Sequence, residues 1–187
     1  MESLLSAFLA AALAEVGDKT QWLTLALTAH FRRPKIVMAA LACAVVANAA
    51  LAGLAGRAIM PLLNREAATL MLALALGSAA ASMAMKVKPP PDVTRARAAF
   101  ATSLILFLAA ELGDKTQFLT FAIATRSGMP ALAALGAALG VFTMAMAAMV
   151  GGRALVEAVP LKAARRTIAG LFALLAFVAA ITALRLI

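Results

Sequence analysis

The chain has 187 residues, of which 65% are hydrophobic and 13% are charged, and its formal net charge is +9. A soluble domain is about 45–50% apolar, and one of this size has too little interior to bury a larger share, so the composition excludes a soluble globular fold. The basic residues lie between apolar stretches and the chain contains no tyrosine, which argues against nucleic-acid binding and in favour of a membrane protein.

Six apolar stretches have about the length of helix, ~20 residues, that a bilayer core requires. The first and fourth run to about 27 residues and carry charges in their middle, so they are expected to tilt, overhang or break. Gly17 and Gly113 lie where a break could occur. The sequence therefore predicts an all-α membrane protein of six transmembrane helices, and the first is expected to be retained rather than cleaved as a signal peptide. The stretches are Ser3–Ala29, Ile36–Gly56, Ala67–Met85, Ala98–Thr125, Ser127–Gly152 and Thr167–Leu184.

The chain repeats itself at an offset of 96 residues. The segment from Glu15 to Ala26, EVGDKTQWLTLA, falls on ELGDKTQFLTFA, which begins at Glu111, with nine of twelve positions identical. Each half contains three stretches, an odd number, so the second half is expected to enter the membrane in the opposite direction. This predicts two inverted three-helix repeats, 1–86 and 98–187, joined by a polar, proline-rich linker over 87–97.

The Lys and Arg residues outside the stretches distribute unevenly, eleven on one predicted side and four on the other. By the positive-inside rule the richer side is cytoplasmic, which predicts both termini outside the cytoplasm. The richer side comprises Arg32, Arg33, Lys35, Lys86, Lys88, Arg95, Arg97, Arg153, Lys162, Arg165 and Arg166, and the other Arg57, Arg65, Arg126 and Arg185.

Four carboxylates in the middle of the charged stretches form the candidate cation site. An intramembrane charge costs at least ~2.5–3.5 kcal/mol, which usually has a functional reason. If the helices are continuous, the Glu and Asp of each motif are three residues apart and share a face. Carboxylates suit hard divalent cations such as Mn²⁺ and Ca²⁺, to which hydroxyl and amide oxygens could be added. The candidate ligands are Glu15, Asp18, Glu111 and Asp114, with Thr20, Thr116, Gln21 and Gln117.

The two motif lysines are expected to balance charge, since Lys19 and Lys115 each follow a glutamate by four residues. Four carboxylates and two lysines leave a charge of −2, which one divalent cation neutralises. Repulsion between packed carboxylates favours protonation without the metal, and a bound metal would displace those protons. This chemistry predicts a cation/proton antiporter. The polar residues Asn48, Ser78 and Ser82 are interpreted as helix-packing hydrogen bonders.

The doubled E-x-G-D-K-T motif resembles the Gdt family of membrane Mn²⁺/Ca²⁺ transporters, within the lysine-exporter-type superfamily. The resemblance covers nearly the whole chain and implies exchange of Mn²⁺ or Ca²⁺ for protons, with bacterial members similar to manganese exporters. It further implies a multi-pass protein of a prokaryotic plasma membrane. The ligands it implies are Glu15, Asp18, Glu111 and Asp114, assisted by Thr20 and Thr116.

Three other functions fit the sequence less well. An intramembrane aspartyl protease would use Asp18 and a Pro-Ala-Leu segment such as the one at Pro130, but its partner motif needs a tyrosine, which the chain lacks. A transporter of a small organic cation or amino acid would need a wider pocket, and a membrane scaffold would not need the paired charges. No enzymatic activity and no cofactor beyond the transported ion are expected, and the sequence leaves open Mn²⁺ or Ca²⁺ and monomer or homodimer.

Overall fold

The computed structural model describes residues 1–187 except 88, 90, 92, 94–97, 159 and 186–187, so most of the predicted linker lies outside the described residues. The described part of the chain forms eight α-helices and one 3-10 turn, with no strand, which confirms the all-α prediction. The elements are α1 (Glu2–Ala14), α2 (Lys19–Phe31), α3 (Pro34–Ile59), η1 (Met60–Leu62), α4 (Arg65–Ala84), α5 (Ala99–Glu111), α6 (Lys115–Ser127), α7 (Pro130–Ala158) and α8 (Leu161–Ala183).

Four helical segments within the described residues are long and apolar enough to cross a membrane. They are Pro34–Leu62, Arg65–Ala84, Pro130–Gly152 and Leu161–Ala183, and each coincides closely with one of the predicted stretches. Proline at the first position of α3 and α7 supplies a helical φ where no intrahelical N–H is needed, which explains where these helices begin.

The other two predicted stretches are broken helices, so of the three alternatives of tilting, overhang and a break, the chain adopts the break. α1 and α2 have 13 residues each, as do α5 and α6. The backbone leaves the helix at Gly17 with φ 64° and at Gly113 with φ 72°, a left-handed region that is costly for residues with a side chain. Each break therefore exposes helix ends in the middle of an apolar stretch.

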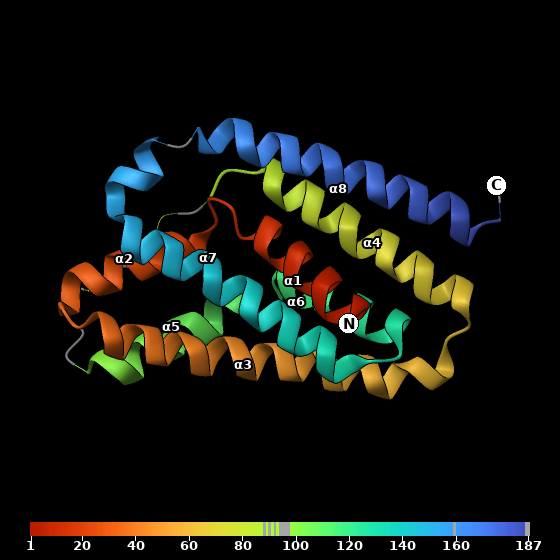
Figure 1. The fold of residues 1–187 in the computed structure, drawn as a ribbon, viewed down its shortest axis with the longest axis horizontal. Helices are drawn as coiled ribbons and strands as arrows, with labels where there is room; N and C mark the ends of the chain where they lie inside the picture. Colours follow the sequence, from red (N-terminus) through yellow and green to blue (C-terminus); the bar gives the residue numbers. More distant parts are fainter. Residues whose placement is uncertain (88, 90, 92, 94–97, 159, 186–187) are drawn as a thin grey trace.

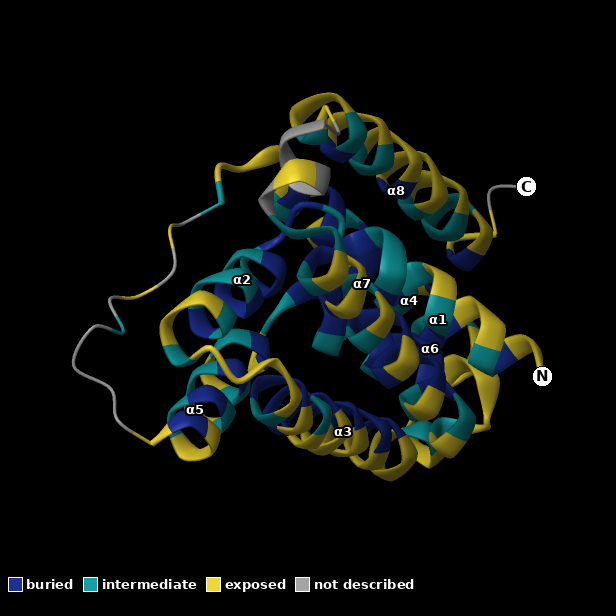
Figure 2. Cartoon of the chain, turned by 60° about the vertical axis from the view of Figure 1, so that its left-hand side comes forward, coloured by how far each residue is buried: buried dark blue, intermediate teal, exposed yellow. Residues whose placement is uncertain are grey.

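The helices form an elongated bundle (Figure 1). α4 and α8 lie side by side along one edge, α1 packs against α7, and α3 runs along the opposite edge beside α5. The N-terminus, the end of α8 and the α3–α4 and α6–α7 connections lie towards one end, whereas the α2–α3 connection and the start of α8 lie towards the other. Buried residues lie where the helices face one another (Figure 2), and they include Glu15, Asp18 and Glu111 at the two breaks.

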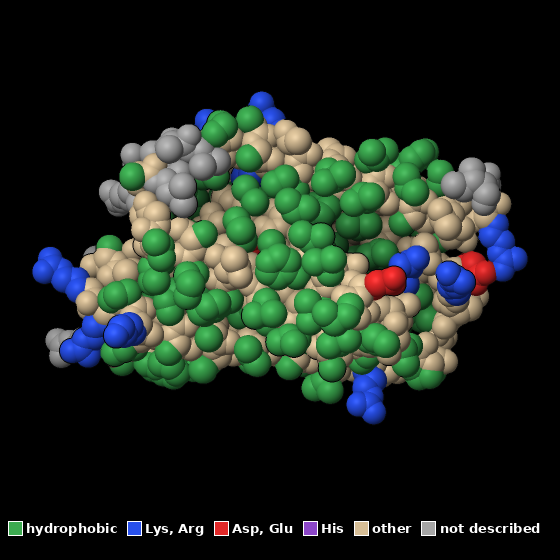
Figure 3. All heavy atoms as spheres, viewed as in Figure 1, with side chains coloured by type: hydrophobic (Ala, Val, Ile, Leu, Met, Phe, Trp, Pro, Cys, Tyr) green, Lys and Arg blue, Asp and Glu red, His purple; other side chains and the backbone are tan. Residues whose placement is uncertain are grey.

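The outer surface is the apolar one. In Figure 3 hydrophobic side chains cover the middle of the molecule, while Lys and Arg lie mostly towards its two ends. Large side chains such as Leu54, Leu74, Val150 and Phe177 are more than half exposed. A helical bundle with a polar, buried centre and an apolar outside is the arrangement that a bilayer favours, because lipid replaces the core as the apolar environment.

Two glycines let α1 and α7 approach closely. A Cβ atom at Gly136 would lie 2.1 Å from the carbonyl oxygen of Leu4, and one at Gly140 would lie 2.6 Å from that of Phe8. Small residues four apart are the usual means by which membrane helices bring their backbones together. The position of α1, and with it the first break, therefore depends on these glycines.

Gly136→Ala is expected to lower the free energy of unfolding by at least ~1–3 kcal/mol, because α1 would have to move away from α7. Gly170→Ala is the matched control, since no atom lies within 4 Å of the added Cβ on α8. Thermal unfolding of the purified variants in detergent measures both. Equal unfolding temperatures for the two variants would contradict the close α1–α7 approach.

Candidate cation site

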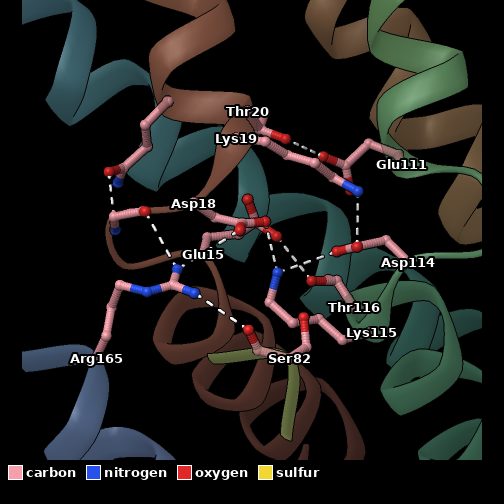
Figure 4. Close-up of polar contacts among 12 residues, drawn as sticks. Glu15, Asp18, Lys19, Thr20, Ser82, Glu111, Asp114, Lys115, Thr116 and Arg165 are labelled. Carbon is pink, nitrogen blue, oxygen red and sulfur yellow. Dashed lines mark hydrogen bonds and ion pairs between the residues drawn. The ribbon is translucent and has the colours of Figure 1, made fainter. Parts of the chain in front are cut away.

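The two breaks lie beside each other inside the bundle and carry all four predicted carboxylates (Figure 4). Glu15 follows the end of α1 and Glu111 ends α5, while Asp18 and Asp114 immediately precede α2 and α6. The aspartates thus lie at helix N-termini, where the helix dipole favours negative charge. The idea that each Glu and Asp share a face of one helix is wrong, because the helix is interrupted between them.

Three of the four carboxylates converge. One oxygen from each of Glu15, Asp18 and Asp114 lies within 4.8 Å of the others, and Glu15 and Asp18 are buried. The fourth, Glu111, is also buried but lies outside this group, and it accepts a hydrogen bond from the Thr20 hydroxyl. The cluster therefore draws on both halves of the chain.

Four polar contacts of the first motif have a counterpart in the second motif at the offset of 96 residues, so much of the two breaks is held in the same way. The Lys115–Asp114 pair and the contacts of Arg165 have no counterpart. The pairs are Thr20 to Glu111 and Thr116 to Glu15; Gly17 N to Gln21 and Gly113 N to Gln117; Lys19 to Asp114 and Lys115 to Asp18; Gln21 to the Met144 carbonyl and Gln117 to the Asn48 carbonyl.

The side chains of Gln21 and Gln117 hold the two helix breaks in position. The side-chain oxygen of Gln21 accepts from the Gly17 N–H at 3.1 Å, and its nitrogen donates to the Met144 carbonyl of α7 at 3.3 Å. Both groups of the amide are thereby used on backbone atoms, and Gln117 makes the equivalent contacts with Gly113 and with α3. This geometry gives the glutamines a positioning role in the site.

Each motif lysine pairs with an aspartate of the other motif, and Lys115 also contacts Asp114 in its own motif. Lys115 Nζ lies 2.5 Å from Asp18 and 3.1 Å from Asp114, and its side chain is only 2% exposed. Lys19 Nζ lies 2.7 Å from Asp114, with 36% of its side chain exposed. The expected pairing with the glutamate four residues earlier does not form, because the break removes the helical spacing on which it depends.

Unused oxygen atoms remain at the site. Among the described residues, Glu15 Oε2 is buried without a hydrogen-bond partner, although a buried carboxylate oxygen is normally satisfied. Thr20 and Thr116 donate their hydroxyl protons to Glu111 and Glu15, which leaves the lone pairs of both hydroxyl oxygens available. The arrangement offers several oxygen donors to a cation in a buried position.

Arg165 is a site residue that the sequence analysis missed, because it was counted among the loop charges. Its buried guanidinium lies 3.6 Å from Asp18 and donates to the Gly17 carbonyl at 3.2 Å, and it also donates to the Ser82 and Met85 carbonyls near the end of α4. The repeat gave no signal for it, since Thr69 occupies the equivalent position. With Arg165 included, the formal charge of the site is −1 and not −2.

The chain matches the family described as "Divalent cation/proton antiporter GDT1" over residues 3–90 and again over residues 99–186. The chain belongs to this family. The two matched segments correspond to the two halves that the 96-residue offset relates, and the resemblance drawn from the doubled motif is confirmed. The GDT1 family is a family of transporters and not a class of enzymes.

A curated relative agrees with this membership. A protein of Vibrio cholerae serotype O1 (strain ATCC 39541 / Classical Ogawa 395 / O395) with the name "Putative manganese exporter" is 31% identical over 171 residues, which cover 90% of this chain and 86% of the relative. No solved structure gives a significant match to the chain.

Proposed function

We propose that this GDT1 family member exchanges a divalent cation for protons by alternating access to a site between its two halves. The observation that carries the proposal is the convergence of Glu15, Asp18 and Asp114, from both motifs, at two helix breaks inside an apolar bundle. Buried carboxylates at broken helices are a common means by which secondary transporters bind ions.

We further propose six membrane spans in two inverted repeats, with α1–α2 and α5–α6 each acting as one interrupted span. Each 13-residue helix is too short for a core that needs about 20 residues, whereas each broken pair is long enough. The alternation of connections between the two ends in Figure 1 supports this count. The repeats would comprise 1–86 and 98–187, with 87–97 and the basic connections in the cytoplasm and both termini outside.

In this site Glu15, Asp18 and Asp114 are the primary ligands. Glu111 and the hydroxyl oxygens of Thr20 and Thr116 assist, while Gln21 and Gln117 hold the breaks in place. The converging group consists of carboxylates, which favour hard, oxygen-binding cations over Zn²⁺ or Cu⁺. The cation is the substrate and not a resident cofactor.

Manganese export across the plasma membrane of a prokaryote is the physiological role that we propose. The name of the Vibrio cholerae relative supports the ion and the direction, and the family description supports exchange for protons. Ca²⁺ uses the same ligand chemistry and is the second candidate ion. A small organic cation is disfavoured because the converging carboxylates leave room for a bare ion.

The test is flux through the purified protein in liposomes that contain a pH-sensitive dye. Mn²⁺ added outside is expected to alkalinise the lumen as protons leave in exchange, whereas protein-free liposomes should not respond. Parallel additions of Ca²⁺, Mg²⁺ and an organic amine rank the substrates. Folded protein that moves neither metal nor protons would overturn the proposal, and a response to the amine alone would favour the organic substrate.

A further inference from the structure

A small cavity lies beside the three-carboxylate group, between α3, α6 and α7. Its volume is about 10 Å³, which is about what one water molecule or a bare ion requires. Its polar wall includes Glu111, Thr116, Thr120 and Asn48, and the rest is mostly valine and alanine from α3 and α7. Glu111, the fourth carboxylate, therefore lines a cavity that the three converging carboxylates do not line.

Asn48 contributes an unsatisfied polar group to this cavity. Its side chain is buried, with the residue 6% exposed, and within the described part of the chain its Nδ2 has no hydrogen-bond partner. An unpaired donor in this position costs ~1–3 kcal/mol, and turning the amide over would place its oxygen, which can bind a cation, here in its stead. The equivalent position in the second half is Met144, so the amide is a feature of one half only and not a requirement of the shared framework.

Thr116 connects the cavity to the three-carboxylate group. It lies on the cavity wall, and its hydroxyl donates to Glu15 at 2.7 Å. Glu111 is tied to the opposite break by the hydrogen bond from Thr20. A cation could therefore pass between the two positions while remaining in contact with oxygen atoms of both motifs.

We propose that this cavity is a second position for the transported divalent cation, bound by the Glu111 carboxylate, the Asn48 amide oxygen and the hydroxyl oxygens of Thr116 and Thr120. A half-turn of the Asn48 amide presents its oxygen to the ion. The inference rests on the proposed function and adds to it a second ion position and a selectivity residue, Asn48.

The small size of the cavity is expected to favour some divalent cations over others. An ion must lose its water to enter a space of about 10 Å³ with mostly apolar walls. Mg²⁺ gives up water reluctantly and usually keeps several water ligands, whereas Mn²⁺ and Ca²⁺ accept protein carbonyls and carboxylates more readily. Asn48 and Glu111 together supply one neutral and one charged oxygen donor, so the site is expected to reject Mg²⁺.

The experiment measures the Kd for Mn²⁺ by titration calorimetry of the full chain in detergent, together with Mn²⁺ flux in liposomes. Asn48→Met, which copies the other half, is expected to raise the Kd ~10–100-fold, the usual range for loss of a metal-site partner. Met146→Leu, at an exposed position of α7 outside the site, is the control and should leave the Kd unchanged. Asn48→Asp keeps the side-chain shape and adds charge, so it should lower the Kd and let Mg²⁺ compete better.

The outcomes separate the inference from the proposed function. Wild-type protein that binds and transports Mn²⁺, with the same Kd in Asn48→Met, would overturn the second position alone, since a residue that only packs changes the unfolding temperature and not the affinity. If Asn48→Met does not fold, an unchanged Kd in Asn48→Asp overturns it equally. Wild-type protein that neither binds nor transports a divalent cation would overturn both.

Discussion

Asp18→Asn is expected to abolish metal-driven proton movement in liposomes. Asp18 supplies one oxygen of the converging group and is the shared partner of Lys115 and Arg165. An amide of the same shape keeps an oxygen but loses the charge that offsets dehydration of a divalent cation. Asp114→Asn should have the same effect, because Asp114 occupies the equivalent place at the second break.

The control for this prediction is Glu66→Gln. Glu66 is a surface carboxylate that pairs with Arg185, far along the chain from both motifs, so its loss should leave transport intact. Removing one partner of a buried ion pair costs ~3–5 kcal/mol, so gel filtration and thermal unfolding must show that Asp18→Asn is folded. A folded Asp18→Asn protein with wild-type flux would contradict the assignment of this carboxylate to the ion.

Much of the site was predictable because its signals are local. Charges in the middle of apolar stretches are costly, and the exact repetition of Glu, Gly, Asp, Lys and Thr in both halves excluded an accidental pattern. The length of the two charged stretches left tilting, overhang and a break as alternatives, and the structure shows the break at Gly17 and Gly113, where the sequence allowed one. The long apolar helices could be predicted from the length of the apolar stretches alone, because the thickness of the bilayer sets the length that a spanning helix needs.

The parts that escaped prediction depend on three-dimensional placement. The lysine pairing follows from two breaks facing each other, which no spacing within one motif encodes. Arg165 lies in α8 and reaches the Gly17 carbonyl from 148 residues away, so it looked like an ordinary basic residue at the end of a stretch. Nothing in the sequence distinguishes Asn48 from a packing residue, because the cavity and the unpaired nitrogen arise only in the folded chain.

The two halves share a framework but differ around the candidate cation site. Paired contacts fix both breaks in the same way, which suits a transporter whose halves exchange roles. The differences are concentrated around the site: Asn48 corresponds to Met144, Arg165 corresponds to Thr69, and Lys115 is far more buried than Lys19. Under the proposed function, such asymmetry would give the two sides of the membrane different affinities for the same ion, as directional export requires.

Lys115→Met is expected to bind Mn²⁺ at least tenfold more tightly than the wild type and to transport it more slowly. The buried ammonium of Lys115 lies between Asp18 and Asp114, where a divalent cation would also be attracted. Two unit charges ~4 Å apart interact by about 4 kcal/mol at an effective dielectric constant of ~20, so removing this positive charge favours the metal by more than the factor of ten. Release then slows, because the ammonium that pairs with both aspartates when the ion departs is absent.

Lys19→Met is the matched comparison, since the two lysines occupy equivalent positions in the repeat. Lys19 is more exposed and contacts only Asp114 among the site carboxylates of the described structure, so solvent screens its charge and its loss should change the affinity less. The prediction is tested by measuring, for both variants, the Kd for Mn²⁺ by calorimetry and the initial rate of Mn²⁺ flux. A Lys115→Met protein with unchanged affinity, or equal effects of the two substitutions, would contradict the view that Lys115 takes the place of the metal between transport cycles.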